Sequence, residues 1–362
     1  MGILEKLLAV QSGAIKKVEV LSESSLFGEK DIIKTNVPII NMAFSGDVNG
    51  GFTTGLTILA GESKTFKTMT SLYCLKAYQD KYPDSVCLFY DCEFGTTPQY
   101  LKTFGIDIDR IIHIPLEHVE QLKFDIVKRL EQIKRGDRVF ILVDSLGNLA
   151  SKKEVDDAES EKSVADMSRA KAIRSLLRII TPHLVKKDLP CFVVNHVYLE
   201  QGLYPKTIIP GGTAVTYASN QIFVITKAQE KTGTDVTGYK FTLNVHKSRF
   251  VKEKSKFPFS VDMNTGINRY SSLIENALES GHVTKPSNGW YSKVNTQTGE
   301  IEDKKYRLSE TNNAEFWDSV MSDASFDQWV KDRYQYGDII ENPSYDSALH
   351  TPKEIDDEHE MG

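Results

Sequence analysis

The sequence is poor in cysteine and contains no long apolar run. Its four cysteines among 362 residues form no Cys-x-x-Cys pair and lie in mostly apolar surroundings. We therefore expect buried thiols in a reducing compartment, without a disulfide framework or a cysteine metal site. No stretch approaches the roughly 18 apolar residues of a membrane span, and the charges near the N-terminus exclude a secretory signal. A cytoplasmic protein without a membrane partner is expected.

An excess of basic residues is also missing, since the formal net charge is −6. Such a balance taken alone argues against a nucleic-acid partner. Five of the acidic residues, however, lie between Glu354 and Glu360, and subtracting them from −6 leaves a net charge of −1 on residues 1–353. A nearly neutral body can still carry a local basic patch.

Short apolar runs alternate with helical periodicity through most of the chain. This alternation predicts an α/β fold in which helices cover both faces of a mostly parallel, twisted sheet. In such folds ligands bind at the carboxyl ends of the strands. The expected strands are Leu56–Ala60, Val86–Tyr90, Ile111–Ile114, Val139–Val143, Cys191–Val194 and Ile222–Ile225, and the expected longer helices are 69–80, His118–Ile133 and 164–184.

Four parts are expected along the chain. Residues 1–30 hold an amphipathic helix from residue 3 to about 20 and an arm whose Leu26 and Phe27 pack either on the chain's own core or on a neighbouring subunit. Residues 31–266 hold the α/β core. Short elements and aromatic residues in 267–342 favour a small α+β or helical domain, and residues 343–362 are expected to be a disordered acidic tail.

Gly61 to Thr68 reads Gly-x-x-x-x-Phe-Lys-Thr, one residue away from the phosphate-loop pattern Gly-x-x-x-x-Gly-Lys-[Ser/Thr]. It lies between a predicted strand and a predicted helix, where backbone N–H groups can face phosphates. Lys67 would reach the terminal phosphates and the Thr68 hydroxyl would ligate Mg²⁺. Because Phe66 replaces glycine, a Lys-Thr-rich turn fits equally well when the segment is taken alone. The candidate loop residues are Gly61, Glu62, Ser63, Lys64, Thr65, Phe66, Lys67 and Thr68.

Three further polar residues follow predicted strands, as a nucleotide triphosphatase requires. Asp144 closes an apolar strand and fits the acid that holds Mg²⁺, although an acid there could simply cap a turn. Glu93 lies three residues beyond another strand and fits a general base, or a solvated turn residue. His196 ends a third strand, where it would be either a γ-phosphate sensor or a structural histidine.

Together these motifs resemble the RecA-type recombinases, and most closely the members from T-even bacteriophages. The resemblance rests on Asn41 to Thr68, Phe89-Tyr-Asp-Cys-Glu, Val143-Asp-Ser-Leu-Gly-Asn-Leu-Ala-Ser-Lys-Lys-Glu, Val194-Asn-His and Pro210-Gly-Gly-Thr. It covers nearly the whole chain and is weakest at the two ends. In the phage subgroup the loop also carries phenylalanine, so we predict that the Phe66 ring points away from the phosphates, beneath the following helix.

The resemblance implies an ATP site with Mg²⁺, in a RecA-like core. Its phosphate loop would hold the triphosphate, with Glu93 as catalytic base and Asp144 with Thr68 at the magnesium. Tyr100 would stack on adenine. His196 stands where bacterial RecA has glutamine, and since both side chains can donate a hydrogen bond the sensor role should persist, with some pH dependence.

Two polar segments, Lys152–Lys162 and Val197–Thr213, would be mobile loops that line a filament axis and hold single-stranded DNA. From composition alone, floppy surface loops are equally consistent. The candidate DNA-binding residues are Lys152, Lys153, Lys162, Tyr198, Lys206, Gly211, Gly212 and Thr213. In the basic stretch His246–Lys256, the resemblance implies that Lys247 and Arg249 reach the neighbouring subunit's ATP; a solvated hairpin is the alternative.

The function implied is a DNA-dependent ATPase that forms a helical homo-oligomeric filament on single-stranded DNA and exchanges strands with homologous duplex DNA. Recombination, repair and recombination-dependent replication would use it. A loader protein and a single-strand-binding protein would be its partners, in the bacterial host cytoplasm if a phage encodes the chain. The alternatives are a hexameric RecA-fold helicase and a non-catalytic scaffold that uses nucleotide only to assemble.

Overall fold

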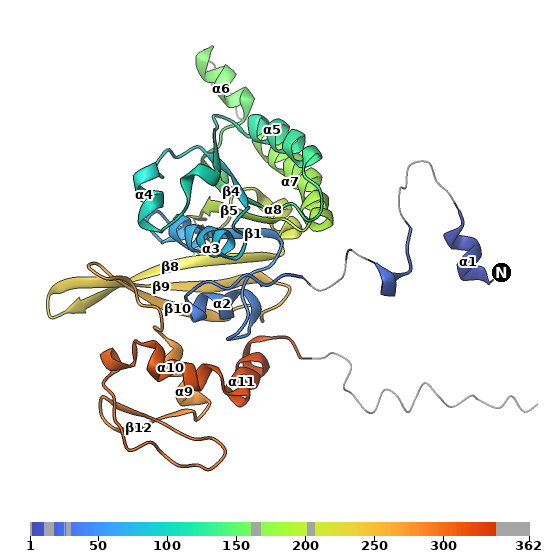
Figure 1. Ribbon diagram of the computed structural model, residues 1–362. Helices are drawn as coiled ribbons and strands as arrows, with labels where there is room; N and C mark the ends of the chain where they lie inside the picture. The colour runs from blue at the N-terminus through green and yellow to red at the C-terminus, as the bar shows by residue number, and fades with distance from the viewer. Residues whose placement is uncertain are drawn as a thin grey trace, which may run out of the picture.

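A computed structural model describes residues 2–10, 18–24, 26, 30–160, 168–200 and 207–337. Its centre is a nine-stranded sheet in the order β11-β10-β9-β8-β1-β5-β4-β2-β3 (Figure 1). The parallel part consists of β1 (Gly55–Gly61), β2 (Val86–Asp91), β3 (Ile111–Pro115), β4 (Val139–Asp144), β5 (Pro190–His196) and β8 (Gln221–Thr232). The antiparallel part adds β9 (Asp235–Ser248), β10 (Lys256–Asp262) and β11 (Gly266–Ile267).

Helices cover both faces of the sheet because successive strand residues point to opposite sides. In β4, Phe140 and Leu142 join the core under α2 (Pro38–Ser45) and α3 (Lys67–Lys81). Ile141 and Val143 join the opposite core, which packs against the remaining large helices. These are α5 (Val119–Gln132), α7 (Ser168–Lys187) and α8 (Gly212–Ala218). The predicted α/β class and two-faced layering are confirmed.

The N-terminal helix is shorter than expected. Helix α1 (Ile3–Leu8) has no buried residue, and it is followed by η1 (Leu21–Glu23). The expectation of one helix to about residue 20 was wrong, since residues 18–20 have no helical structure. A short helix without tertiary packing has little to extend it. Phe27 lies outside the described residues.

The C-terminal part after β11 is a small α+β unit beneath the sheet (Figure 1). It consists of α9 (Leu273–Glu279), β12 (Val283–Ser287), β13 (Trp290–Lys293), η4 (Leu308–Thr311), α10 (Ala314–Met321) and α11 (Ala324–Tyr334). The end of α11 joins it to the core, because the Tyr334 ring packs on Phe257 at 4.7 Å and Gln335 Nε2 donates to the Ser45 carbonyl at 2.9 Å. In the part of the chain described, no helix has the length and hydropathy of a membrane span.

The sheet order brings the predicted site residues to one edge. Strands β1, β5, β4 and β2 are successive neighbours. Their registers pair Gly61 with His196 and Asp91 with Asp144, all at carboxyl ends. Residues distant in sequence therefore converge where α3 begins.

Candidate nucleotide-binding and catalytic site

A cavity of about 520 Å³ lies at this edge of the sheet. That volume is within the usual range for a small-molecule site. Its wall combines the phosphate loop with the loops after β2, β4 and β5. The lining residues are Ser63, Lys64, Thr65, Phe66, Lys67, Thr68, Met69, Glu93, Gly95, Thr96, Tyr100, Asp144, Val194 and His196.

The phosphate loop is held closed by its own polar groups. Thr65 Oγ1 and Lys67 Nζ both donate to the Glu62 carbonyl, at 2.8 and 2.6 Å. Gly61 is required by space, since a Cβ there would lie 2.5 Å from Thr65 Oγ1 and 2.6 Å from the Ile225 carbonyl oxygen. Burial lowers the pKa of Lys67, and the nearby carboxylates of Glu93 and Asp144 oppose this shift. A bound anion such as a triphosphate would add to these carboxylates as countercharge for the buried ammonium.

Phe66 has a φ of +70°, in the left-handed region that favours glycine. Its ring packs on Phe241 of β9 at 4.8 Å, on Phe259 of β10 at 5.6 Å and on Tyr73 of α3 at 6.3 Å. The side chain is only 8% exposed. Burial of the ring therefore offsets the backbone strain, and the loop keeps a glycine-like backbone without glycine.

Replacing Phe66 by glycine should destabilise the protein even though it restores the usual loop residue. Loss of a buried phenylalanine ring costs about 3–5 kcal/mol, while relief of the left-handed backbone returns about 1 kcal/mol. We expect the free energy of unfolding, measured in urea, to fall by about 2–4 kcal/mol. Phe66→Ala is the matched control and should be less stable than Phe66→Gly; the reverse order would contradict this account of the loop.

Asp144 ends β4 and lies opposite Thr68, whose Oγ1 donates to Asp144 Oδ2 at 2.8 Å. Among the described residues Asp144 Oδ1 is buried without a hydrogen-bond partner. Burial raises the pKa of Asp144 to about 6, and the neighbouring carboxylates of Glu93 and Asp91 add to the rise while Thr68 opposes it. A buried, unpaired carboxylate oxygen with a raised pKa is suited to a cation.

The residues present fit Mg²⁺ bound together with a triphosphate. Magnesium usually takes one or two protein ligands and fills its shell with phosphate oxygens and water. Thr68 and Asp144 provide that number of protein ligands. In the described ranges no group of three or more histidine, cysteine or acidic side chains could hold a metal by itself.

Glu93 lies across the cavity, where three donors converge on one carboxylate oxygen. Ser145 Oγ at 2.5 Å, Asn148 Nδ2 at 2.9 Å and His196 Nε2 at 2.9 Å all contact Glu93 Oε1. Burial raises the pKa of Glu93, but the hydrogen bonds from Ser145 and His196 and the charges of His196 and Lys67 outweigh it, so the pKa lies below its ordinary value. In the part of the chain that the structure describes, the other oxygen, Oε2, accepts none of these hydrogen bonds and could orient a water molecule.

Tyr100 of α4 (Pro98–Thr103) lines the cavity and packs edge-on to Phe104 at 5.3 Å. Lys247 and Arg249 are not among the lining residues. Lys247 Nζ instead donates to the carbonyls of Thr216 at 2.5 Å and Ser219 at 2.8 Å, at the end of α8. Within one chain this basic pair is thus separate from the cavity.

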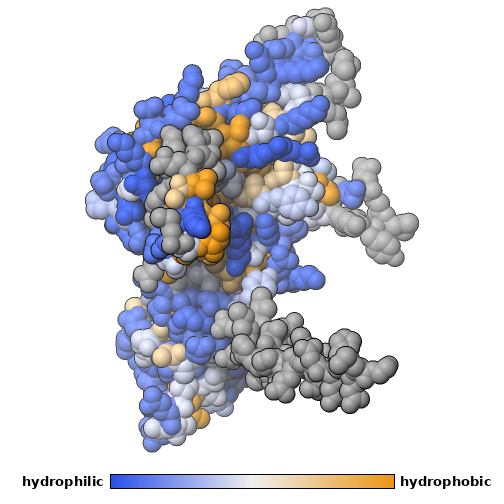
Figure 2. All heavy atoms as spheres, turned by 90° about the vertical axis from the view of Figure 1, so that its right-hand side faces the viewer, coloured by the Kyte–Doolittle hydropathy of each residue, from blue (hydrophilic) through white to orange (hydrophobic). Residues whose placement is uncertain are grey.

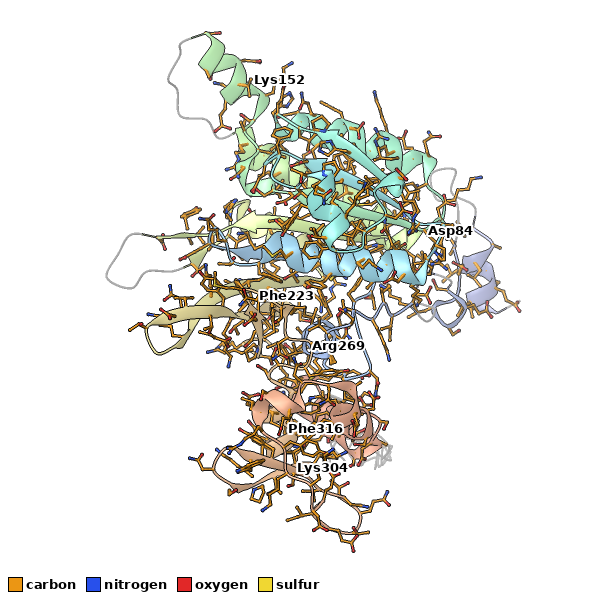
Figure 3. The ribbon with its side chains drawn as sticks, turned by 60° about the vertical axis from the view of Figure 1, so that its left-hand side comes forward. Asp84, Lys152, Phe223, Arg269, Lys304 and Phe316 are labelled. Carbon is orange, nitrogen blue, oxygen red and sulfur yellow. The ribbon has the colours of Figure 1, made fainter. Side chains whose placement is uncertain are left out.

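The first predicted DNA loop is partly helical, which corrects the sequence-based expectation. Helix α6 (Lys152–Glu159) has a capping box in which Ser151 Oγ accepts from the Glu154 N–H at 3.0 Å and the Glu154 carboxylate accepts from the Ser151 N–H. The sequence Ser151-x-x-Glu154 is a capping-box pattern that could have predicted this helix start. Helix α6, which carries Lys152, stands out from the body (Figure 1, Figure 3), and Lys153 pairs with Asp157. Lys162 lies outside the described residues.

The second predicted loop contains two short strands, β6 (Tyr198–Leu199) and β7 (Thr207–Ile208), which pair in antiparallel fashion. Tyr198 is 57% exposed. Gly211 and Gly212 adopt left-handed φ values of +98° and +62° just before Thr213 in α8. Lys206 lies outside the described residues.

A basic helix face next to α8 was not predicted from the sequence. Helix α7 contains no acidic residue, and its Lys171, Arg174 and Arg178 line two adjacent cavities, one shared with Thr213 and Tyr217 of α8. Tyr217 is 77% exposed. Figure 2 views the molecule from the side that carries the N-terminal arm, α7 and α8, and both apolar and hydrophilic side chains lie on this face. The absence of acid from a 20-residue helix was the available signal.

Comparison with known proteins agrees with this geometry. The model of the RecA N-terminal domain matches residues 17–268. The chain belongs to the RecA family. A second model, the C-terminal domain of the bacteriophage T4 recombination and repair protein, matches residues 270–330.

Family relatives differ widely in their similarity. The recombination and repair protein of Enterobacteria phage T4 is 46% identical over 92% of this chain and 86% of its own length. Protein RecA of Cutibacterium acnes is 25% identical over 82% of this chain and 84% of its own. Protein RecA of Acinetobacter baylyi is 25% identical over 73% and 74%. The predicted resemblance to the RecA family and to its T-even phage members is confirmed.

Proposed function

We propose that this protein is an ATP-dependent recombinase that assembles on single-stranded DNA and exchanges strands with homologous duplex DNA. The observation that carries the proposal is the convergence in one cavity of a phosphate loop, a buried acid with one oxygen unpaired among the described residues, and a hydrogen-bonded glutamate. Membership of the RecA family and the similarity to the T4 recombination and repair protein support the reaction type.

In the proposed mechanism the phosphate loop and Lys67 hold the triphosphate of ATP. Thr68 and Asp144 would hold Mg²⁺, which when bound would neutralise charge on the phosphates. Glu93 accepts a proton from the attacking water. Tyr100 stacks on the adenine ring of ATP. His196 Nε2 lies 2.9 Å from Glu93 Oε1 and would divide its contact between Glu93 and the γ-phosphate when ATP is bound.

The proposed DNA surface combines the end of the second loop with the basic face of α7. Lys171, Arg174 and Arg178 would contact phosphates, whereas Tyr198 and Tyr217, both more than half exposed, offer rings on which bases can stack. Glycines at 211 and 212 let the backbone approach a strand closely. Such contacts tolerate any sequence and weaken with salt. The contribution of Lys152 and Lys153 would come from α6.

Filament assembly is supported by surfaces left without a partner within one chain. Strand β3 ends the nine-stranded sheet, and its Ile112 is 42% exposed. The α1 side chains Ile3, Leu4 and Leu7 are 57–73% exposed. An open strand edge and an uncovered apolar arm favour association. We propose that residues 1–30 form an oligomerisation arm, 31–266 the ATPase core, 267–342 the small C-terminal domain and 343–362 the tail.

Mixing two inactive variants tests whether Lys247 and Arg249 act on the neighbouring subunit's ATP. Glu93→Gln chains lack the base, and chains with both Lys247→Ala and Arg249→Ala lack the basic pair. In an equal, random mixed filament one interface in four joins an intact base to an intact pair, so ATP hydrolysis should recover to about a quarter of the wild-type rate. If the mixture regains no ATP hydrolysis, Lys247 and Arg249 do not act on the ATP of the neighbouring subunit.

Strand exchange and electron microscopy separate this proposal from its alternatives. With ATP and single-stranded DNA we expect helical filaments and transfer of a labelled strand from homologous duplex, but not from heterologous duplex. Closed rings without filaments would favour a hexameric helicase. Phage recombination of this kind is proposed to involve a loader and a single-strand-binding protein, so the assay should be repeated with DNA already coated by such a protein.

A further inference from the structure

Arg169, in the first turn of α7, holds a one-turn helix that precedes the first loop. Its Nε donates to the Leu149 carbonyl at 2.7 Å, and its Nη2 donates to the carbonyls of Gly147 at 2.5 Å and Leu146 at 3.4 Å. These acceptors lie in or directly after η3 (Leu146–Asn148). Carbonyls at a helix end lack intrahelical partners, and the rigid fork of a guanidinium can bind several of them.

The same short helix touches the catalytic base. Asn148 Nδ2 donates to Glu93 Oε1 at 2.9 Å. Ser145, immediately before η3, donates its hydroxyl to the same oxygen and is fixed by Cys92, which accepts from its N–H at 3.3 Å and donates to its carbonyl at 3.0 Å. A continuous series of contacts therefore runs from Arg169 of α7 through η3 to the Glu93 carboxylate.

Helix α7 also carries the basic face proposed to bind DNA. Arg174 lies five residues, and Arg178 nine residues, beyond Arg169 on the same 20-residue helix. Since a helix moves largely as a rigid element, a shift of α7 on binding DNA would change the grip of Arg169 on η3. Leu146 and Leu149, each 1% exposed, anchor η3 in the core, so its displacement would be small and would act mainly on Asn148.

We propose that Arg169 and Asn148 are positioning residues that transmit the binding of single-stranded DNA on α7 to the Glu93 carboxylate. The proposal rests on the function proposed above, and the route that it describes runs through η3. Neither residue needs to touch ATP or DNA. Their effect is on where Glu93 places its free oxygen relative to the attacking water.

The test compares ATP turnover with and without saturating poly(dT) in wild type, Asn148→Ala, Arg169→Ala and the double variant. Wild type should be stimulated, and each single variant should lose about tenfold in stimulated kcat, because a slightly misplaced catalytic group is costly. The KM for ATP and the affinity of Asn148→Ala for poly(dT) should stay unchanged. The double variant should resemble the single ones, since both act in one series.

Arg110→Ala is the matched control. Arg110 also binds backbone carbonyls, those of Tyr82 at 3.2 Å and Pro83 at 2.8 Å, but it contacts neither η3 nor Glu93, and its stimulation should equal that of wild type. Unchanged stimulation in Asn148→Ala and Arg169→Ala, equal losses with and without DNA, or independent effects in the double variant would overturn the route. A wild type without stimulation would overturn the proposed function, and the route with it.

Discussion

Replacing Glu93 by glutamine should abolish ATP turnover while ATP binding is retained. Glutamine keeps the size of the side chain and an oxygen that can accept from Ser145, Asn148 and His196. It cannot accept a proton from water. General-base catalysis contributes about 10²–10⁴-fold, so kcat should fall by about that factor. The Kd for a fluorescent ATP analogue should change by less than about threefold, because Lys67 and the loop amides are untouched.

Glu131→Gln is the control for the loss of one acidic charge in the Glu93 experiment. Glu131 is an exposed acid of α5 and is not among the residues that line the cavity. Its replacement should leave kcat close to the wild-type value. Undiminished turnover in Glu93→Gln would remove Glu93 as the base and would favour a scaffold that only binds nucleotide.

Replacing Asp144 by asparagine should stabilise the nucleotide-free protein and impair its function. The rise in the pKa of Asp144 from 3.8 to about 6 means that the folded state disfavours the charged carboxylate. A rise of this size corresponds to about 3 kcal/mol, which a neutral amide would recover at pH 7. The same change removes the charge that would hold Mg²⁺, and we expect the affinity for Mg²⁺ with ATP to fall by about 10–100-fold.

The pH dependence distinguishes this explanation from a general packing effect. The pKa of Asp144 is higher in the folded state than in the unfolded state. The stability that the protonated Asp144 gives to the wild type is therefore lost as the pH rises through about 6. The advantage of Asp144→Asn should therefore be full above about pH 7 and should be small near pH 4, where Asp144 is protonated in the folded state and about half protonated in the unfolded state. Urea unfolding of both proteins at pH 4 and pH 7.5 measures the difference in their free energies of unfolding. A difference that does not depend on pH would contradict a raised pKa of Asp144 as its cause.

Much of the fold and of the site was predictable from local sequence. Apolar runs closed by acids located β2 and β4, and the parallel arrangement of α/β folds then implied that Gly61, Asp144 and His196 would lie at one edge. Phe66 could not be explained locally. Its left-handed backbone is stabilised by Phe241 and Phe259, which lie far along the chain, so no pattern near the loop could have predicted that compensation.

The residues that support Glu93 were also missed, for a similar reason. Asn148 lies in a segment that carries the resemblance, but nothing in that segment indicates its contact with Glu93. Arg169 follows no motif, and its contacts depend on where α7 packs against η3. Helix α6 was missed although its capping box was present, since the resemblance favoured a mobile loop there. Contacts set by periodicity and strand ends were thus accessible from sequence, whereas contacts set by tertiary placement were not.

Steady-state ATP hydrolysis by the full chain, measured at saturating ATP and Mg²⁺ with and without poly(dT), tests the central claim most directly. If the cavity is a DNA-responsive ATPase site, turnover should rise at least about tenfold with DNA, and the rise should disappear in Glu93→Gln. Turnover that is the same with and without DNA, or that survives in Glu93→Gln, would contradict the account.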